Sequence, residues 1–279
     1  MIRILVDSAS DYQLEEIKEK NMELVSIQIT IGDKNYRDGI DLDRNDFYGI
    51  LEKSGAFPKT SQPSPQEFLD IFKDVKEKGD EIVCILLSSA LSGTYQSAFL
   101  AKNMVEYDKI YLIDSLSATY CLKVMADYAC RLRDAGESAA QIAAQVEAIK
   151  SRVKVLAALD TLEYLSRGGR LSKTAAAIGD MANIKPIITL TQDGKVGIIG
   201  KCLGKNKAIC SLKKHLQEMN PDESFPLYPI YSFGTENCGL MEEKLVQEGY
   251  HPDKRLQIGP TIGSHIGPEA FGIIFVTKG

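Results

Sequence analysis

The sequence lacks the excess of positive charge that nucleic-acid binding requires. It contains 33 Lys and Arg against 38 Asp and Glu, a formal net charge of -5. A general nucleic-acid binder needs a basic face to meet phosphates, so the composition argues against that class. The sequence also lacks any run of the roughly 20 apolar residues that a membrane span requires. Its apolar start at residues 2–6 is too short for a signal peptide. We therefore predict a cytoplasmic protein without an integral membrane segment.

No two of the six cysteines form a Cys-x-x-Cys pair, and Cys84 lies inside an apolar run. Scattered thiols are typical of a reducing compartment and argue against a disulfide framework or a zinc site. Asp7 and Asp114 end two predicted strands and could bind a metal, but carboxylates in such places more commonly cap the following turn. No spacing resembles a metal-binding set, so the sequence predicts neither a metal nor another cofactor.

The first half of the chain alternates apolar strands, hydroxyl-rich turns and helices. Residues 2–6, 81–87 and 109–113 are apolar runs of the kind that parallel sheets bury on both faces. Residues 24–31 alternate apolar and polar positions, which predicts one strand with an exposed face. This order predicts an N-terminal α/β/α domain with a parallel sheet, over residues 1–152, whose ligands lie beyond the carboxyl ends of the strands.

Three helix starts have the spacing of a capping box, in which a side chain and a residue three positions later cap each other. They are Ser10 with Gln13, Ser64 with Glu67, and Ser138 with Gln141. Three prolines exclude regular structure from residues 56–65. Residues 59–63 are therefore expected to form a rigid loop leading to a helix start.

The second half combines a hairpin with helices. Asp193 and Gly194 separate two β-rich runs, which is a strong hairpin signal. An Ala-rich helix is expected from residue 173 to about residue 181. We predict a C-terminal α+β domain over residues 153–279, packed closely on the first because no flexible linker separates them.

A candidate anion site follows the apolar run that ends at Leu87. The chain there enters a turn rich in hydroxyls and then a helix that starts near Thr94. Such a junction directs free N–H groups toward an anion. Ser92, with the amides of Gly93 and Thr94, is the strongest candidate to hold a carboxylate oxygen. A plain helix cap is the commoner use of Ser and Thr here, and the two roles are compatible.

Other candidates are single residues in loops. Thr60 and Ser61 could bind an anion or only stabilise a turn. His265 lies among glycines, which allow a ligand to approach closely, whereas His215 and His251 are expected to be solvated or in a loop. Arg170 carries a guanidinium suited to phosphate.

Each of two basic segments fits two different roles. Arg167 fits a solvated turn as well as a phosphate contact. Residues 195–214 contain six lysines and no acidic residue. This stretch could be a solvated face or a docking surface for an acidic patch on a partner.

Seven short motifs occur together in one order. They are residues 6–11, 59–63, 91–97, 114–117, 165–172, 184–186 and 262–268. Each is weak alone, but their combination resembles the DegV family, the fatty-acid-binding subunits of the bacterial fatty acid kinase system. The resemblance extends from Val6 to Gly272.

The resemblance implies a two-domain α/β fold that holds one long-chain fatty acid between its domains. Thr60 and Ser92 would bind the carboxylate, and the tail would lie in an apolar tunnel. His265 would be a head-group residue that could help neutralise an acyl phosphate, and Arg170 would lie near the opening where the kinase docks. The fatty acid kinase subunit would phosphorylate the acid with ATP. The chain itself would be a carrier without catalytic residues, and it could contact a membrane transiently.

Two other hypotheses remain. A serine hydrolase or phosphotransferase would use Ser92 as nucleophile and His265 as base. Against it, Ser92 lacks the Gly-x-Ser-x-Gly elbow, and no Asp is evidently placed to orient His265. A lipid-sensing regulatory protein would share the pocket of a carrier.

Overall fold

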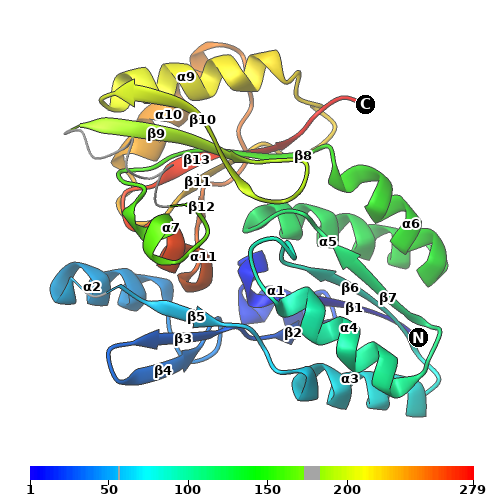
Figure 1. Cartoon of the computed structure of the whole chain (residues 1–279). Coiled ribbons are helices and arrows are strands. Elements are labelled where there is room, and N and C mark those ends of the chain that lie inside the picture. Colours follow the sequence, from blue (N-terminus) through cyan, green and yellow to red (C-terminus); the bar gives the residue numbers. More distant parts are fainter. Residues whose placement is uncertain (56, 173–182) are drawn as a thin grey trace.

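The structure, a computed structural model, describes residues 1–55, 57–172 and 183–279 (Figure 1). A four-stranded parallel sheet has the order β2-β1-β6-β7. Its strands are β1 (Ile2–Asp7), β2 (Met22–Val25), β6 (Glu81–Leu86) and β7 (Ile110–Asp114). Successive residues of a strand face opposite sides, so Ile4 and Leu5 enter different apolar clusters. Both faces of this sheet are therefore buried, as the apolar runs predict.

Four helices cover the parallel sheet. They are α3 (Pro65–Glu77) and α4 (Thr94–Val105) on one face, and α5 (Tyr120–Asp134) and α6 (Ala139–Lys150) on the other. The predicted capping boxes at Ser64 and Ser138 are confirmed. The one predicted at Ser10 is wrong. Ser10 ends a short 3-10 helix, η1 (Ser8–Ser10), and the capping box of α1 (Leu14–Glu19) joins Gln13 to Glu16.

A second, three-stranded antiparallel sheet has the order β4-β3-β5. It contains β3 (Gln28–Ile31), β4 (Lys34–Arg37) and β5 (Lys59–Ser61), and α2 (Arg44–Ser54) packs on it. The prediction of one strand over residues 24–31 is therefore wrong. The chain leaves the parallel sheet after Val25, and the amide of Ile27 bonds to Ser8 Oγ at 2.9 Å. The predicted loop at 59–63 is also partly a strand, because β5 pairs with β3.

The second half forms a six-stranded sheet of order β10-β9-β8-β13-β11-β12, antiparallel except for the last pair. Its strands are β8 (Val153–Ala158), β9 (Ile184–Leu190), β10 (Val196–Leu203), β11 (Tyr228–Tyr231), β12 (Leu256–Gln257) and β13 (Phe271–Val276). The helices α9 (Lys205–Glu218) and α10 (Glu236–Gln247) cover one face. On the opposite face, Ala157, Ile188 and Ile274 share one apolar cluster with Ile4 and Val6 of β1.

The mixed α/β fold class is thus confirmed, with a parallel sheet and further sheets. The hairpin at Asp193 and Gly194 joins β9 to β10. The predicted domain boundary falls between α6 and β8. Two short helices, α7 (Glu163–Arg167) and α11 (Pro260–Ile266), lie between the large sheet and the small one (Figure 1). The Ala-rich helix expected over residues 173–181 lies outside the described residues.

Within the described ranges, no helix is both long enough and apolar enough to cross a membrane.

Candidate functional site

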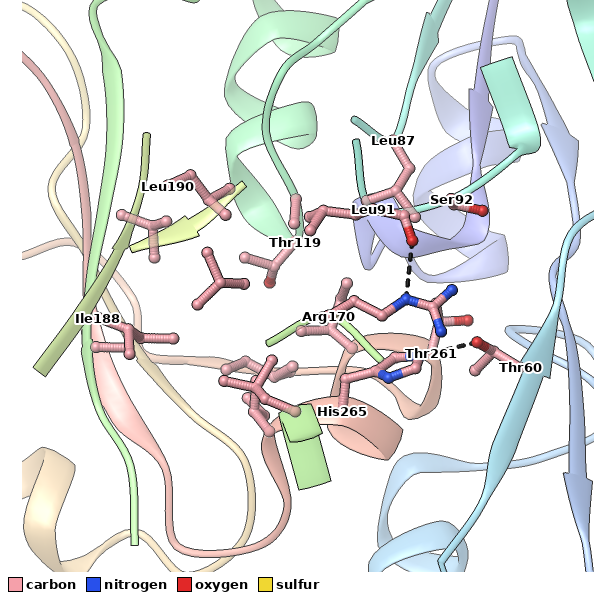
Figure 2. A pocket seen from close by; sticks show the side chains of 18 of the residues that line it. Thr60, Leu87, Leu91, Ser92, Thr119, Arg170, Ile188, Leu190, Thr261 and His265 are labelled. Carbon is pink, nitrogen blue, oxygen red and sulfur yellow. Dashed lines mark hydrogen bonds between the residues drawn. The ribbon is translucent and has the colours of Figure 1, made fainter. Parts of the chain in front are cut away.

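A pocket lies between the six-stranded sheet and the turns that precede α4 and α5 (Figure 2). It contains about 790 Å³ of space outside protein atoms, part of it open to solvent. Both halves of the chain supply its walls, so the pocket exists only when the two halves pack together.

One end of the pocket is aliphatic. Val155 and Ala157 of β8, and Ile188 and Leu190 of β9, line it. The members of each pair are two residues apart, so their side chains leave the same face of the sheet. Ile230 of β11 extends this wall. Such a surface favours a hydrocarbon chain, since each CH₂ removed from water contributes about 0.8 kcal/mol.

The other end of the pocket is polar. Thr60, Ser92, Arg170 and His265 gather there from four separate elements, opposite Ile188 and Leu190 (Figure 2). The structure thus brings together four of the seven predicted site residues. The pocket is amphipathic, with a polar end and an aliphatic end.

Strand geometry separates Thr60 from its neighbour Ser61. Both lie in β5, where successive side chains point to opposite faces. Thr60 faces the pocket, whereas Ser61 is exposed and does not line it. The expectation that Ser61 contacts a ligand therefore has no support in this geometry.

Ser92 lies one position before Gly93, the residue that caps the start of α4. Gly93 has no side chain to cap the helix, but Ser92 Oγ accepts from the amide of Thr94 at 3.3 Å. The positive dipole end of α4 favours an anion near Ser92. Gly93 and Thr94 do not line the pocket. Thr94 is buried, and its hydroxyl lies 2.9 Å from Ser92 Oγ. At Gly93, a Cβ would lie 1.8 Å from the Gln62 side-chain oxygen. These two residues shape the turn that presents Ser92.

His265 makes one hydrogen bond, to Thr60. Its Nε2 lies 2.8 Å from Thr60 Oγ1, and its buried Nδ1 has no partner among the described residues. An unpaired buried N–H is rarer than an unpaired acceptor, so the favoured tautomer carries its proton on Nε2. His265 then donates to Thr60, and the Thr60 hydroxyl remains free to donate to a ligand.

The imidazole of His265 is neutral at pH 7. Burial, with a smaller effect of the nearby Arg170 charge, lowers the pKa of His265 to about 4. A neutral ring adds no positive charge to the pocket, and a contribution of His265 to neutralising an acyl phosphate stays a prediction. Its ring holds the Thr60 side chain by the 2.8 Å hydrogen bond.

We expect acid to destabilise the protein through His265. The pKa is 6.5 for an unperturbed histidine and about 4 in the folded protein, so the unfolded chain binds more protons between these values. The free energy of unfolding should therefore fall as the pH drops from 6.5 to 4. Urea denaturation of the lipid-stripped protein at several pH values checks this against His265→Gln. The variant should lose this part of the pH dependence. If its free energy of unfolding changed with pH as in the wild type, the effect would not come from His265.

The two arginines of the Arg-Gly-Gly-Arg turn have different surroundings. Arg170 is partly buried, lines the pocket, and donates through Nε to the carbonyl of Leu91 at 2.9 Å. It therefore belongs to the polar end of the pocket itself, rather than only to an outer opening. Arg167 is exposed and pairs with Glu163 at 2.6 Å.

A buried polar network, which the sequence did not reveal, holds the start of α11. The side chains of Asp11, Asp38, Arg44 and Tyr48 bind backbone groups of residues 257–261 at 2.8 to 3.2 Å. Burial raises the pKa of Asp11 to about 7, although Arg44 opposes the shift, and burial also raises the pKa of Asp38. The network positions α11 and with it His265. Residue types alone carry no signal for it, because its members lie far apart in sequence.

The remaining candidates are structural. Asp7 accepts from the amides of Ala9 and Leu87, as a cap does, and Asp114 accepts from the amide of Leu116. The described residues contain no group of three or more His, Cys, Asp or Glu that could hold a metal. In the stretch 195–214, four lysines have acidic partners, which favours a solvated face.

A family model described as "Uncharacterised protein, DegV family" matches residues 1–278. A DegV domain-containing protein of Caldanaerobacter subterraneus is 34% identical over 283 residues, which cover 99% of both chains. One of Clostridium acetobutylicum is 33% identical over 279 residues, again covering 99% of both chains.

Solved structures share the fold over the whole chain. A fatty-acid-binding DegV family protein from Thermus thermophilus is 27% identical with a TM-score of 0.88, covering 99% of both chains. A stearic-acid-binding protein from Eubacterium ventriosum is 28% identical with a TM-score of 0.88, covering 100% of this chain and 99% of the other. The Bacillus subtilis fatty acid binding protein DegV is 29% identical with a TM-score of 0.85, covering 99% of both.

Proposed function

Because this chain belongs to the DegV family, we propose that it binds one long-chain fatty acid in the pocket between its two halves. The observation that carries the proposal is the amphipathic pocket, with Thr60, Ser92, Arg170 and His265 at one end and an aliphatic wall at the other. Solved relatives described as binding fatty acids support it.

The carboxylate would lie at the polar end. Ser92, at the positive dipole end of α4, would hold one oxygen, and Thr60, oriented by His265, would donate to the other. Arg170 would add positive charge nearby. Hydrogen bonds to a charged acceptor contribute roughly 1.5–3 kcal/mol each. Several are needed, because burying an unpaired carboxylate costs several kcal/mol.

The chain itself would perform no chemistry on the acid. It would present the carboxylate to a separate ATP-dependent kinase, which transfers the γ-phosphoryl group of ATP to a carboxylate oxygen and releases ADP. The resemblance to the fatty acid kinase system motivates this step. Against the alternative of a serine hydrolase, His265 bonds to Thr60, and Ser92 Oγ bonds to Thr94. The nucleophile–base pair of a serine hydrolase is therefore not assembled.

Lipid extraction tests the proposed function. The protein purified from cells is denatured, and its extract is examined by mass spectrometry; the stripped protein is then offered palmitate or oleate. We expect a bound acyl chain and uptake of the added acid. Absence of both would refute the proposal.

A second arm separates carrier from enzyme. We expect acyl phosphate only when loaded protein, kinase and ATP are combined. Hydrolysis of an acyl ester by this chain alone, lost in Ser92→Ala, would instead favour the hydrolase.

A further inference from the structure

Three side chains from two segments stack on the surface beside the polar end of the pocket. Phe57, which precedes β5, and Tyr164 of α7 have ring centroids 4.8 Å apart. The guanidinium carbon of Arg167 lies 3.9 Å from the centroid of the Phe57 ring. We call Phe57, Tyr164 and Arg167 the latch. It joins the N-terminal segment that carries Thr60 to the C-terminal helix α7.

The turn after α7 also supports His265. A Cβ at Gly168 would lie 2.3 Å from His265 Nδ1, so only glycine lets the imidazole rest against this turn. A Cβ at Gly267 would lie 2.5 Å from the Tyr164 ring. Helix α7 and the turn after it therefore pack directly against α11 at both of these glycines.

The latch thus spans the same two parts of the chain as the Thr60–His265 hydrogen bond. Phe57 is three residues before Thr60, and Arg167 immediately precedes Gly168, on which His265 rests. The bond at 2.8 Å joins residues 205 positions apart. Its geometry depends on how β5 is held against α7 and α11.

We propose that the latch positions Thr60 against His265 and thereby slows release of the bound acid. Phe57 and Arg167 are positioning residues, since neither lines the pocket. The effect on release rests on the proposed function, whereas the effect on the Thr60–His265 pair does not.

Arginine suits this position because its planar guanidinium can stack on a ring and still pair with a carboxylate. Arg167 does both, with Phe57 and with Glu163. Lysine would keep the ion pair but stack less well, so Arg167→Lys should restore part of the effect lost in Arg167→Gln. A general loss of folding stability would not place Arg167→Lys between the wild type and Arg167→Gln.

Nuclear magnetic resonance of the stripped protein tests the positioning directly. The chain has only three histidines, so ¹⁵N-histidine labelling isolates the imidazole of His265. We expect Arg167→Gln and Phe57→Ala to shift its ring nitrogen signals, Arg167→Lys to shift them less, and His215 and His251 to stay unchanged. Arg37→Gln, which breaks an exposed Arg–Asp pair on β4, is the matched control. Unchanged His265 signals in both latch variants would overturn the proposal.

Release of cis-parinaric acid from the loaded protein tests the consequence. We expect release to be about 2- to 5-fold faster in Arg167→Gln and Phe57→Ala, as loss of an exposed cation–π contact allows. Arg37→Gln should release the acid at the wild-type rate. Unchanged release in the latch variants would overturn the role in retention while leaving the proposed function intact. If the wild type takes up no acid, the proposed function fails, and the His265 signals alone decide the positioning.

Discussion

Replacing Ser92 or Thr60 with alanine is expected to weaken fatty-acid binding by about 10- to 100-fold each. Each variant removes a hydroxyl that would bond to the carboxylate, and such bonds contribute roughly 1.5–3 kcal/mol. Ser92 lines the pocket beside the start of α4, and Thr60 faces it from β5. Displacement of cis-parinaric acid by oleate measures the affinity of each variant.

Two controls make this result specific. Ser61→Ala removes a hydroxyl one residue from Thr60, but on the exposed side of β5, so its affinity should match the wild type. Oleyl alcohol has the same tail without the charge, so the variants should lose oleate binding more than alcohol binding. Equal losses in Ser61→Ala, or equal losses for acid and alcohol, would contradict the assigned carboxylate site.

Arg44→Met is expected to lower the free energy of unfolding by about 3 kcal/mol, because it leaves buried polar groups without their cationic partner. Arg44 donates to the hydroxyl of Tyr120 at 2.7 Å and to the carbonyl of Gln257 at 2.8 Å. It also lowers the pKa of Asp11, which burial otherwise raises. Urea denaturation measures the loss, and binding of oleate reports the accompanying displacement of α11.

The loss should be larger at pH 8 than at pH 6. The pKa of Asp11 is about 7 in the folded protein and 3.8 when unperturbed, so stability through this group declines as the pH rises through 7. Without Arg44 the folded pKa of Asp11 rises further, and the ionised carboxylate at pH 8 lacks its partner. Arg37→Met, which breaks only an exposed pair with Asp41, should change stability little at either pH. A loss that does not depend on pH would contradict the coupling between Arg44 and Asp11.

Local patterns predicted the elements whose signal lies within one segment. The apolar runs of β1, β6 and β7, the caps of α3 and α6, and the hairpin of β9 and β10 all occur as expected. The alternation over residues 24–31 was misleading, because β2 and β3 continue the same pattern in different sheets. A period of two identifies strands but not their partners.

The candidate site residues also fall into those that the sequence identified correctly and those that the structure places elsewhere. Residue chemistry and the turn motifs indicated Thr60, Ser92, Arg170 and His265, and all four line one pocket. Ser61, Gly93 and Thr94 shared those motifs but point elsewhere or support the turn. Which member of a motif faces a cavity depends on strand register and helix phase, and a motif does not specify these.

The sequence by itself determined the class of strands and helices, the turn chemistry, and the resemblance to one family, because these depend on neighbouring residues. Only the tertiary structure decided that His265 bonds to Thr60, that Gly168 supports its ring, and that Arg44 joins the first half of the chain to the strand before α11. These contacts join residues more than 90 positions apart. Their geometry is set by packing three sheets and their helices together, which no local pattern encodes.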